Sequence, residues 1–254
     1  MNQWNKPPLG SQIDFSHPLA KGLALCLLMN EGSGNKIYDL SGNGNHGVLM
    51  TNGPLWKPGR DGAALAFDGV NDQVECGISA SFAANSPKTF ILWINTSVTT
   101  AYNGLFWISY GYGFSMIDAT NILLILSHNN YKYFLGRATC SDGQWHQLAI
   151  TLTGLAQSDI ASAKFYIDSK VQADGFINAS APIYAFDRYW FGRGYGAYFT
   201  GSMSQTMIYN RALSADEILD LYVNPYGFIR DPHKYWLMPQ NVMIPPHILH
   251  RRAA

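Results

Sequence analysis

Short apolar runs recur along the chain from Gly22 onwards, and stretches rich in Gly, Asn and Asp separate them. Typical examples are GLALCLLM (22–29), KTFILWINT (88–96), WHQLAITLT (145–153) and RYWFG (188–192). About a dozen runs of strand length, each bounded by turn residues, predict an all-β sandwich or barrel rather than alternating strands and helices.

Two of these runs predict how their strands are buried. Apolar and polar residues alternate in WHQLAITLT, so the face that carries His146 is expected to meet the core and the other face to stay open. We expect His146 to be a hydrogen-bonded histidine of the core or its rim. KTFILWINT is apolar on both faces, which predicts a strand covered on both sides, with Trp93 buried.

One segment predicts a helix. Ser214 is followed three residues later by Glu217, which is a capping box, and Ile218, Leu221 and Tyr222 then form an apolar stripe. Pro225 marks the end of this short helix.

Proline-rich segments flank this body. Residues 1–21 carry three prolines and no sustained period, which predicts an extended N-terminal arm leading into a domain over 22–223. Residues 224–254 carry five of the 12 prolines, with four basic residues and one acidic residue, a net charge of +3. A disordered tail is usually poor in aromatic residues. The sequence therefore predicts a C-terminal arm that binds another protein chain through Tyr226, Phe228, Tyr235 and Trp236, and the alternative is that the arm packs on its own domain.

Composition and charge exclude several classes. With 17 basic and 17 acidic residues the net charge is zero, so nucleic acid is not an expected partner. No apolar run approaches the roughly 20 residues of a membrane-spanning helix, and Pro7 and Pro8 are not expected in a secretion signal. The three cysteines stand at long spacings, which predicts neither a zinc site nor a disulfide framework.

Five stretches in order carry a resemblance to a known family. They are GLALCLLMNEGSGNKIYDLSGNGNHG (22–47), GAALAFDGVNDQVEC (62–76), DGQWHQLAITLTG (142–154), AKFYID (163–168) and YNRALSADEILDLY (209–222). Together they resemble the concanavalin A-like lectin/glucanase jelly roll of the laminin G type, over roughly residues 22–223. The resemblance implies a jelly-roll β-sandwich of two antiparallel sheets with one short C-terminal helix.

The flanks carry a second resemblance. KPPLGSQIDFSHPLAKGL (6–23) and LYVNPYGFIRDPHKYW (221–236) are similar to the flanks of this domain in tailed-phage and prophage structural proteins. This implies a non-catalytic virion protein of the decoration, fibre or tail-accessory kind, able to bind glycans. Its partners would be other virion proteins or copies of itself through the terminal arms, with cell-surface polysaccharide as a further candidate and with no membrane and no nucleic acid. The alternative is a secreted or surface carbohydrate-binding module, and a glycoside hydrolase is the least favoured class.

The candidate chemistry is aromatic rather than acidic. The only glutamates are Glu31, Glu75 and Glu217, and none stands at the spacing that would give a retaining glycosidase its carboxylate pair. Catalytic residues are therefore not expected. Sugar sites often stack aromatic rings on pyranose faces, which makes ligand-binding candidates of Trp107, Tyr110, Tyr112, Tyr195 and Tyr198. The same rings could instead fill a core or an oligomer interface.

The loop Asp39–Asn45 is a candidate calcium site, with Asp39, Asn43 and Asn45 as the oxygen ligands. In the family this loop often binds structural calcium together with an acidic pair on a later strand. The matching positions here are Ser204 and Gln205, so the charge is missing. We expect no cofactor and no metal, and the alternative for the loop is an Asx-rich turn.

Overall fold

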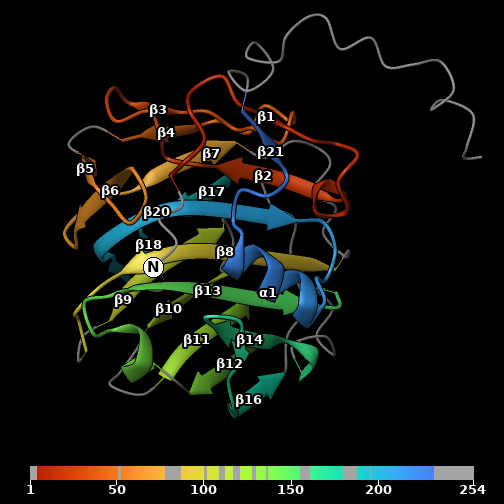
Figure 1. The fold of residues 1–254 in the computed structure, drawn as a ribbon. Coiled ribbons are helices and arrows are strands. Elements are labelled where there is room, and N and C mark those ends of the chain that lie inside the picture. Colours follow the sequence, from red (N-terminus) through yellow and green to blue (C-terminus); the bar gives the residue numbers. More distant parts are fainter. Residues whose placement is uncertain are drawn as a thin grey trace, which may run out of the picture.

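The computed structural model describes residues 5–50, 53–77, 87–99, 102–108, 112–116, 121–127, 130–135, 137–154, 161–179, 188–194 and 196–231. In this part of the chain, two large antiparallel sheets pack face to face, and the nine-stranded sheet lies behind the eight-stranded sheet in Figure 1. The predicted jelly-roll β-sandwich is confirmed. No helix in the described ranges is long and apolar enough to cross a membrane.

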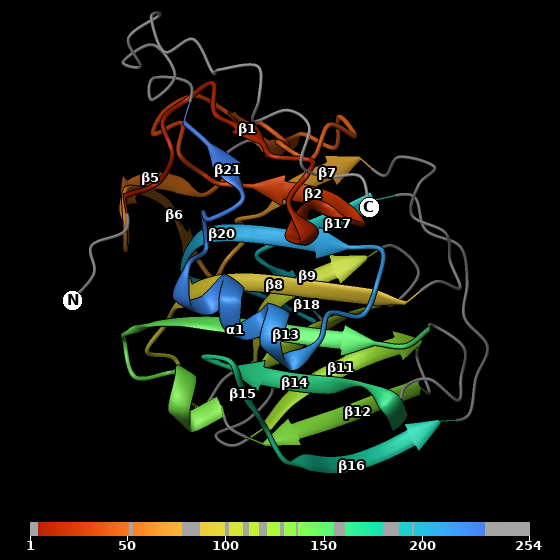
Figure 2. The same ribbon diagram turned by 45° about the vertical axis from the view of Figure 1, so that its right-hand side comes forward.

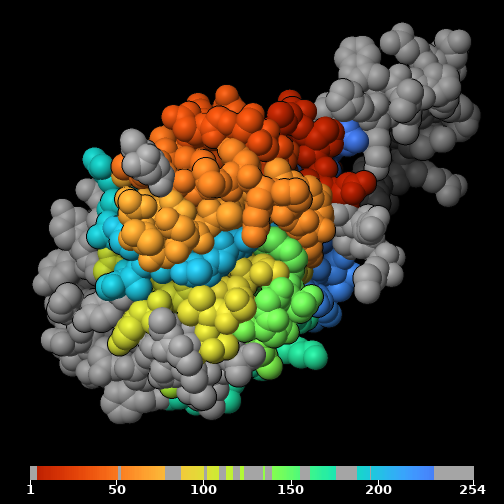
Figure 3. Space-filling view, turned by 90° about the vertical axis from the view of Figure 1, so that its left-hand side faces the viewer, coloured from red at the N-terminus to blue at the C-terminus, as the bar shows by residue number. Residues whose placement is uncertain are grey.

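The eight-stranded sheet has strand β20 (Thr200–Tyr209) near its centre. The order across the sheet is β15 (Lys170–Val171), β14 (Lys164–Ile167), β13 (Trp145–Leu152), β8 (Lys88–Asn95), β20, β6 (Ala63–Asp68) and β5 (Leu55–Pro58). The first half of β20 pairs with β6, and its second half pairs with β2 (Leu23–Leu27). Figure 3 shows β6, β20, β8 and β13, which are far apart in sequence, as successive orange, cyan, yellow and green bands on one face.

The nine-stranded sheet is built from shorter strands. Its order is β16 (Asp174–Ala179), β12 (Asn130–Leu135), β11 (Asn121–Ser127), β10 (Tyr112–Met116), β9 (Asn103–Ile108), β17 (Arg188–Phe191), β7 (Val74–Gly77), β4 (Gly47–Leu49) and β3 (Lys36–Ile37). Strand β17 therefore brings residues from the last third of the chain between two strands from its first half.

Aromatic rings fill the core between the two sheets. Phe90 of β8 packs against Phe106 and Phe114 of the other sheet, with ring centroids 4.9 and 6.0 Å apart. Strand β8 is buried on both faces, as its sequence predicts, and Trp93 is only 4% exposed.

A second core covers the outer face of the eight-stranded sheet. Helix α1 (Ala215–Val223) lies over β8 and β13 in Figures 1 and 2, and it buries Ile218 and Leu221 there. Its capping box is confirmed, because the Ser214 side chain accepts from the amide of Glu217 and the Glu217 carboxylate accepts from the amide of Ser214. The indole of Trp93 stacks on the ring of Tyr222, with centroids 5.7 Å apart.

The outer cover corrects one prediction about β13. Its polar face was expected to stay open, yet Gln147 is 1% exposed and Thr151 is 6% exposed. Period-two alternation shows that a strand has two different faces, but it does not show whether a helix or a terminal segment covers the polar one.

Both terminal segments belong to this outer layer, at least as far as the structure describes them. Strand β1 (Gln12–Ile13) pairs with β21 (Ile229–Arg230), and the short 3-10 helix η1 (Pro18–Ala20) buries Leu19. Elsewhere in the chain, a second 3-10 helix, η2 (Arg137–Cys140), precedes β13 and takes no part in this layer's strand pairing. Lys6 joins the N-terminal segment to the sheet, because its ammonium donates to the carbonyls of Met29, Ala63 and Ser204 at the point where β20 changes partner.

Residues 224–231, the first part of the predicted C-terminal arm, pack on their own domain. Tyr226 is 8% exposed and Phe228 is fully buried in the second core, and the Tyr226 hydroxyl donates to Asp61 at 2.6 Å. These two rings pack in the core of their own chain and are not accessible to a partner. The other two predicted anchors, Tyr235 and Trp236, lie outside the described residues.

Candidate functional site

Two tryptophans lie next to each other on the outer face of the nine-stranded sheet. Trp190 of β17 is the cross-strand partner of Trp107 of β9. Side chains alternate in direction along a strand. Because the sequence neighbours of both tryptophans are buried in the core, both indoles point outward, where they are half-buried.

A glycine on the next strand makes room for Trp107. Gly113 of β10 is its cross-strand partner on the other side. A Cβ atom at Gly113 would lie 2.7 Å from Cε3 of Trp107 and 2.2 Å from the carbonyl oxygen of Phe106. The Trp107 ring therefore lies close against β10 in space that no other residue type would leave open.

A small hairpin forms one wall of a hollow beside Trp107. It consists of β18 (Arg193–Gly194) and β19 (Ala197–Tyr198), and it packs tightly on β9, since a Cβ atom at Gly104 would lie 2.2 Å from the amide nitrogen of Gly194. The hollow has a volume of about 260 Å³, and the residues that line it are Trp107, Arg193, Gly194, Gly196, Ala197 and Tyr198. We call the rings of Trp107, Trp190 and Tyr198, with this hollow, the aromatic shelf.

Charged groups surround the aromatic shelf. The Trp190 indole donates to Glu75 Oε2 at 3.1 Å, and Arg188 donates to Glu75 Oε1 at 3.0 Å. The guanidinium of Arg193 lies 5.5 Å from the centre of the Trp190 ring, within the range of a cation–π interaction. Flat ring faces beside hydrogen-bonding groups suit a ligand that has both apolar faces and polar edges.

The structure brings together part of the predicted ligand site. Trp107 and Tyr198 line the same hollow. Tyr112 begins β10 opposite Ile108, but its side chain lies outside the described part, as do Tyr110 and Tyr195 altogether.

The sequence interpretation missed Trp190, Glu75 and Arg193. Alternation within RYWFG separates Trp190 from the buried Tyr189 and Phe191, so its outward direction could have been predicted. That β17 lies between β7 and β9 could not be predicted from alternation, because the order of strands in a sheet depends on long-range pairing.

Comparison with known proteins places this chain in a family. A family model described as the concanavalin A-like lectin/glucanases superfamily matches residues 68–219, which is more than half of the chain. The chain belongs to this superfamily. The matched range runs from the end of β6 into α1 and includes every residue of the aromatic shelf. No curated protein matches the sequence.

Solved structures share the superfamily fold with this chain at low sequence identity. The binding domain of Paraclostridial Mosquitocidal Protein 1 is 18% identical with a TM-score of 0.59, over 82% of this chain and 53% of that one. The botulinum neurotoxin serotype D binding domain is 15% identical with a TM-score of 0.61, over 82% and 53%. The botulinum neurotoxin DC binding domain in complex with SialylT is 14% identical with a TM-score of 0.60, over 81% and 52%. The chain spans about half the length of these domains, and the likeness extends to the fold alone.

In this superfamily member, the Asp39 loop is closed by its own hydrogen bonds. The Asp39 carboxylate accepts four, at 2.8 to 3.0 Å, from the amides of Cys26, Ser41 and Asn45 and from the hydroxyl of Ser41. These donors occupy the lone pairs that a calcium ion would need.

The other proposed calcium ligands are also engaged within the chain. The side-chain amides of Asn43 and Asn45 donate to the carbonyl of Ala24 in β2, at 3.2 and 3.0 Å. Ser204 and Gln205, at the family's acidic positions, are neutral and buried in β20. In the described ranges, no three His, Cys, Asp or Glu side chains gather where they could hold a metal ion. The loop residues fit an Asx-rich turn and do not fit a calcium site.

The three glutamates serve structural contacts. Glu31 accepts from the amide of Tyr38 at 2.8 Å, and Glu217 caps α1 and pairs with Arg211 at 2.7 Å. Glu75 lies on the outer face of one sheet, whereas Glu217 lies on the helix that covers the other sheet, so the two lie on opposite sides of the sandwich. A retaining glycosidase needs two carboxyl groups about 5 to 5.5 Å apart, which these two cannot provide.

His146 is held on both sides by carboxylates. Its Nδ1 lies 2.7 Å from Asp168 Oδ2, and its Nε2 lies 3.0 Å from Asp142 Oδ1. The hydrogen bond with Asp168, and then that with Asp142, raises the pKa of His146 above its ordinary value, although partial burial opposes this. With both ring nitrogens engaged, His146 is the rim histidine that its sequence position predicts.

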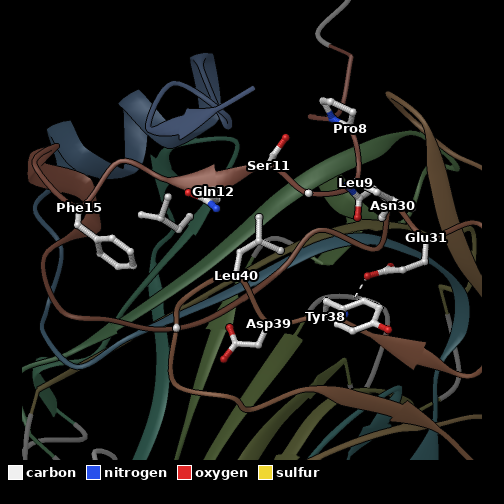
Figure 4. Close-up of a pocket in the computed structure, with 13 residues that line it drawn as sticks. Pro8, Leu9, Ser11, Gln12, Phe15, Asn30, Glu31, Tyr38, Asp39 and Leu40 are labelled. Atoms are coloured by element: carbon white, nitrogen blue, oxygen red, sulfur yellow. Dashed lines mark hydrogen bonds between the residues drawn. The ribbon is translucent and has the colours of Figure 1, made fainter. Parts of the chain in front are cut away.

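A second hollow, of about 490 Å³, lies between residues 8–15 and residues 38–42, as Figure 4 shows. Leu9, Phe15, Tyr38 and Leu40 give it mostly apolar walls. Its two carboxylates, Glu31 and Asp39, accept hydrogen bonds from backbone amides of the chain. It suits a hydroxyl-rich ligand less well than the aromatic shelf, which combines flat rings with charged groups.

Proposed function

We propose that this chain is a non-catalytic carbohydrate-binding module and that the aromatic shelf is its glycan site. The observation that carries the proposal is the pairing of Trp107 with Trp190 on an outward face, beside a hollow with a polar rim. One face of a pyranose ring is apolar and can lie on an indole, while its hydroxyls turn to the carboxylate and guanidinium groups at the rim.

The placement of the acidic residues supports binding without turnover. Both oxygens of Glu75, the carboxylate beside the aromatic shelf, accept hydrogen bonds from Trp190 and Arg188. A general acid must be able to present its carboxyl group to the leaving group, whereas the carboxyl group of Glu75 is held by two side chains of its own chain.

Relatives of the same fold give the proposal further support. Solved structures contain the binding domain of botulinum neurotoxin DC in complex with SialylT and in complex with rat synaptotagmin II. A jelly roll of this shape thus occurs in domains whose work is to bind a partner, and our proposal places this chain in that class.

The test is binding of the purified full chain to a panel of soluble polysaccharides and oligosaccharides, measured by calorimetry. We expect at least one glycan to bind, and we expect Trp107→Ala to weaken that binding by about 30-fold, which corresponds to about 2 kcal/mol for loss of a central aromatic contact. The control is Tyr38→Ala, which removes a 51% exposed ring from the unrelated hollow and should leave the affinity unchanged. Equal affinity of wild type and Trp107→Ala for every bound glycan would contradict the proposed site.

We further propose that the module acts on a virion, as a decoration, fibre or tail-accessory protein. The support is the similarity of its flanks, residues 6–23 and 221–236, to those of phage structural proteins. A mass-spectrometric inventory of purified particles from the source should contain the chain at a stoichiometric level. If it is found in the culture medium and not on particles, the alternative of a secreted carbohydrate-binding module holds instead.

A further inference from the structure

Arg193 differs from the other arginines whose side chains the structure describes. Four of them form ion pairs with a carboxylate at 2.5 to 3.0 Å, namely Arg60, Arg188, Arg211 and Arg230. Arg193 has no carboxylate partner within the described ranges, and its contact there is the face of the Trp190 ring. Its positive charge is therefore balanced by no neighbouring side chain that the structure describes.

This charge sits at the edge of the aromatic shelf. Arg193 and Tyr198 are cross-strand partners in the hairpin, so their side chains share one face of it. Both residues line the hollow with Trp107, and the Arg193 guanidinium also lies over Trp190. A ligand stacked on the tryptophans would thus have a guanidinium beside it.

Among the residues that the structure describes, the charged side chains named at the aromatic shelf add up to a net positive charge. Glu75 contributes −1, Arg188 and Arg193 contribute +1 each, and the sum is +1, whereas the whole chain has a net charge of zero. Arg188 is already paired with Glu75 at 3.0 Å, so the excess charge belongs to Arg193.

We propose that the aromatic shelf selects acidic sugars and that Arg193 binds the sugar carboxylate. This inference rests on the proposed function of the shelf. A guanidinium presents two parallel N–H donors that match the two oxygens of a carboxylate, and a charge-assisted pair of this kind is stronger than a hydrogen bond to a neutral hydroxyl. The aromatic faces supply sugar stacking in general, and Arg193 supplies the preference for the acid.

The experiment compares each acidic glycan with its own methyl ester, which has the same sugar skeleton without the charge. The probes are polygalacturonate, hyaluronate and sialyllactose, each with its methyl ester, titrated against the full chain. We expect the acid form of at least one pair to bind about tenfold more tightly than the ester, a difference of about 1.4 kcal/mol.

Two variants separate the role of Arg193 from a general effect of charge. Arg193→Gln should reduce affinity for the acid about tenfold, to that of the ester, and leave affinity for the ester unchanged. Arg188→Gln removes the same charge from the same face, but from an arginine already paired with Glu75, and should preserve the preference for the acid. Arg193→Lys should restore part of the preference, because it keeps the charge without the paired donors.

The outcomes distinguish the two proposals. Equal binding of acid and ester, or equal loss of both in Arg193→Gln, would overturn the role of Arg193 while leaving a glycan site at Trp107. An equal effect of Arg188→Gln and Arg193→Gln would also overturn it. If neutral glycans bind but none of these acidic probes does, only the proposed preference for acidic sugars is contradicted. If no glycan binds at all, the proposed function is contradicted as well.

Discussion

Trp107 and Trp190 face outward, half-buried, because of their position in two alternating strands. In RYWFG the buried residues are Tyr189 and Phe191, so Trp190 between them faces outward, and the same pattern holds for Trp107 between Phe106 and Ile108. The sequence alone suggested Trp107 and Tyr198 as ligand residues. It could not show that Trp190 and Glu75 are their neighbours, because that depends on pairing between strands over 80 residues apart.

His146 gives a prediction about pH. Asp168 raises the pKa of His146 in the folded state, so the folded chain holds this proton more tightly than the unfolded chain does. The resulting stabilisation is fully present below the ordinary histidine pKa of about 6.5 and is lost as the pH rises through the higher folded pKa. Asp168→Asn should therefore reduce the gain in unfolding free energy between about pH 8.5 and pH 5.5.

Urea denaturation of both proteins at the two pH values measures this difference. Asp168 also accepts a hydrogen bond from the amide of Gln147, and the substitution changes the stability through that contact too. Comparing the pH dependence of stability, rather than stability at one pH, separates the effect of His146 from the effect of that hydrogen bond. An identical pH dependence in wild type and Asp168→Asn would show that the pair does not couple to folding.

At the scale of elements, patterns within one segment of the sequence predicted single helices and strands, but they did not predict which distant strands pair. The capping box at Ser214 and Glu217 identified α1, and apolar runs identified the central strands. The pairing of β1 with β21 escaped prediction, because each strand has only two residues and the two lie at opposite ends of the chain. A segment rich in aromatic residues and proline can bind a partner chain or pack on its own domain. Tyr226 and Phe228 pack on their own domain.

The burial of Phe228 predicts a large effect on stability. It is fully buried in the layer between α1 and the terminal segments, so Phe228→Ala should lower the free energy of unfolding by about 3 to 5 kcal/mol. Leu219→Ala on the exposed side of α1 is the control and should change it by less than about 0.5 kcal/mol. Chemical denaturation measures both, and a loss below about 1 kcal/mol in Phe228→Ala would mean that residues 224–231 do not belong to the core.

At the scale of the whole molecule, we propose that the sandwich needs no ion in the Asp39 loop, because that loop is closed by hydrogen bonds to β2. The melting temperature should therefore be the same with and without EDTA. A tightly bound ion at saturation would add about 3 to 4 kcal/mol through linkage, so a clear fall in the melting temperature on chelation would show that calcium does bind.

The fold class could be predicted from the sequence because five family motifs occur in the right order along one chain. The layer outside the eight-stranded sheet could not be predicted, because it is built from α1 and two terminal segments whose packing no local pattern encodes. This layer leaves the outer face of the nine-stranded sheet, on the other side of the molecule, as the place where tryptophans are presented.

The central claim is that a glycan lies on Trp107 and Trp190, and the indole N–H signals of the chain test it most directly. In a nitrogen-15 correlation spectrum, with signals assigned by Trp107→Phe and Trp190→Phe, titration with the bound glycan should shift the signals of these two indoles. The signals of Trp93, buried beneath α1, and of Trp56 on β5 should stay in place. Saturable shifts at Trp107 and Trp190 alone are the predicted result, and saturable binding that leaves both signals unmoved would contradict the account.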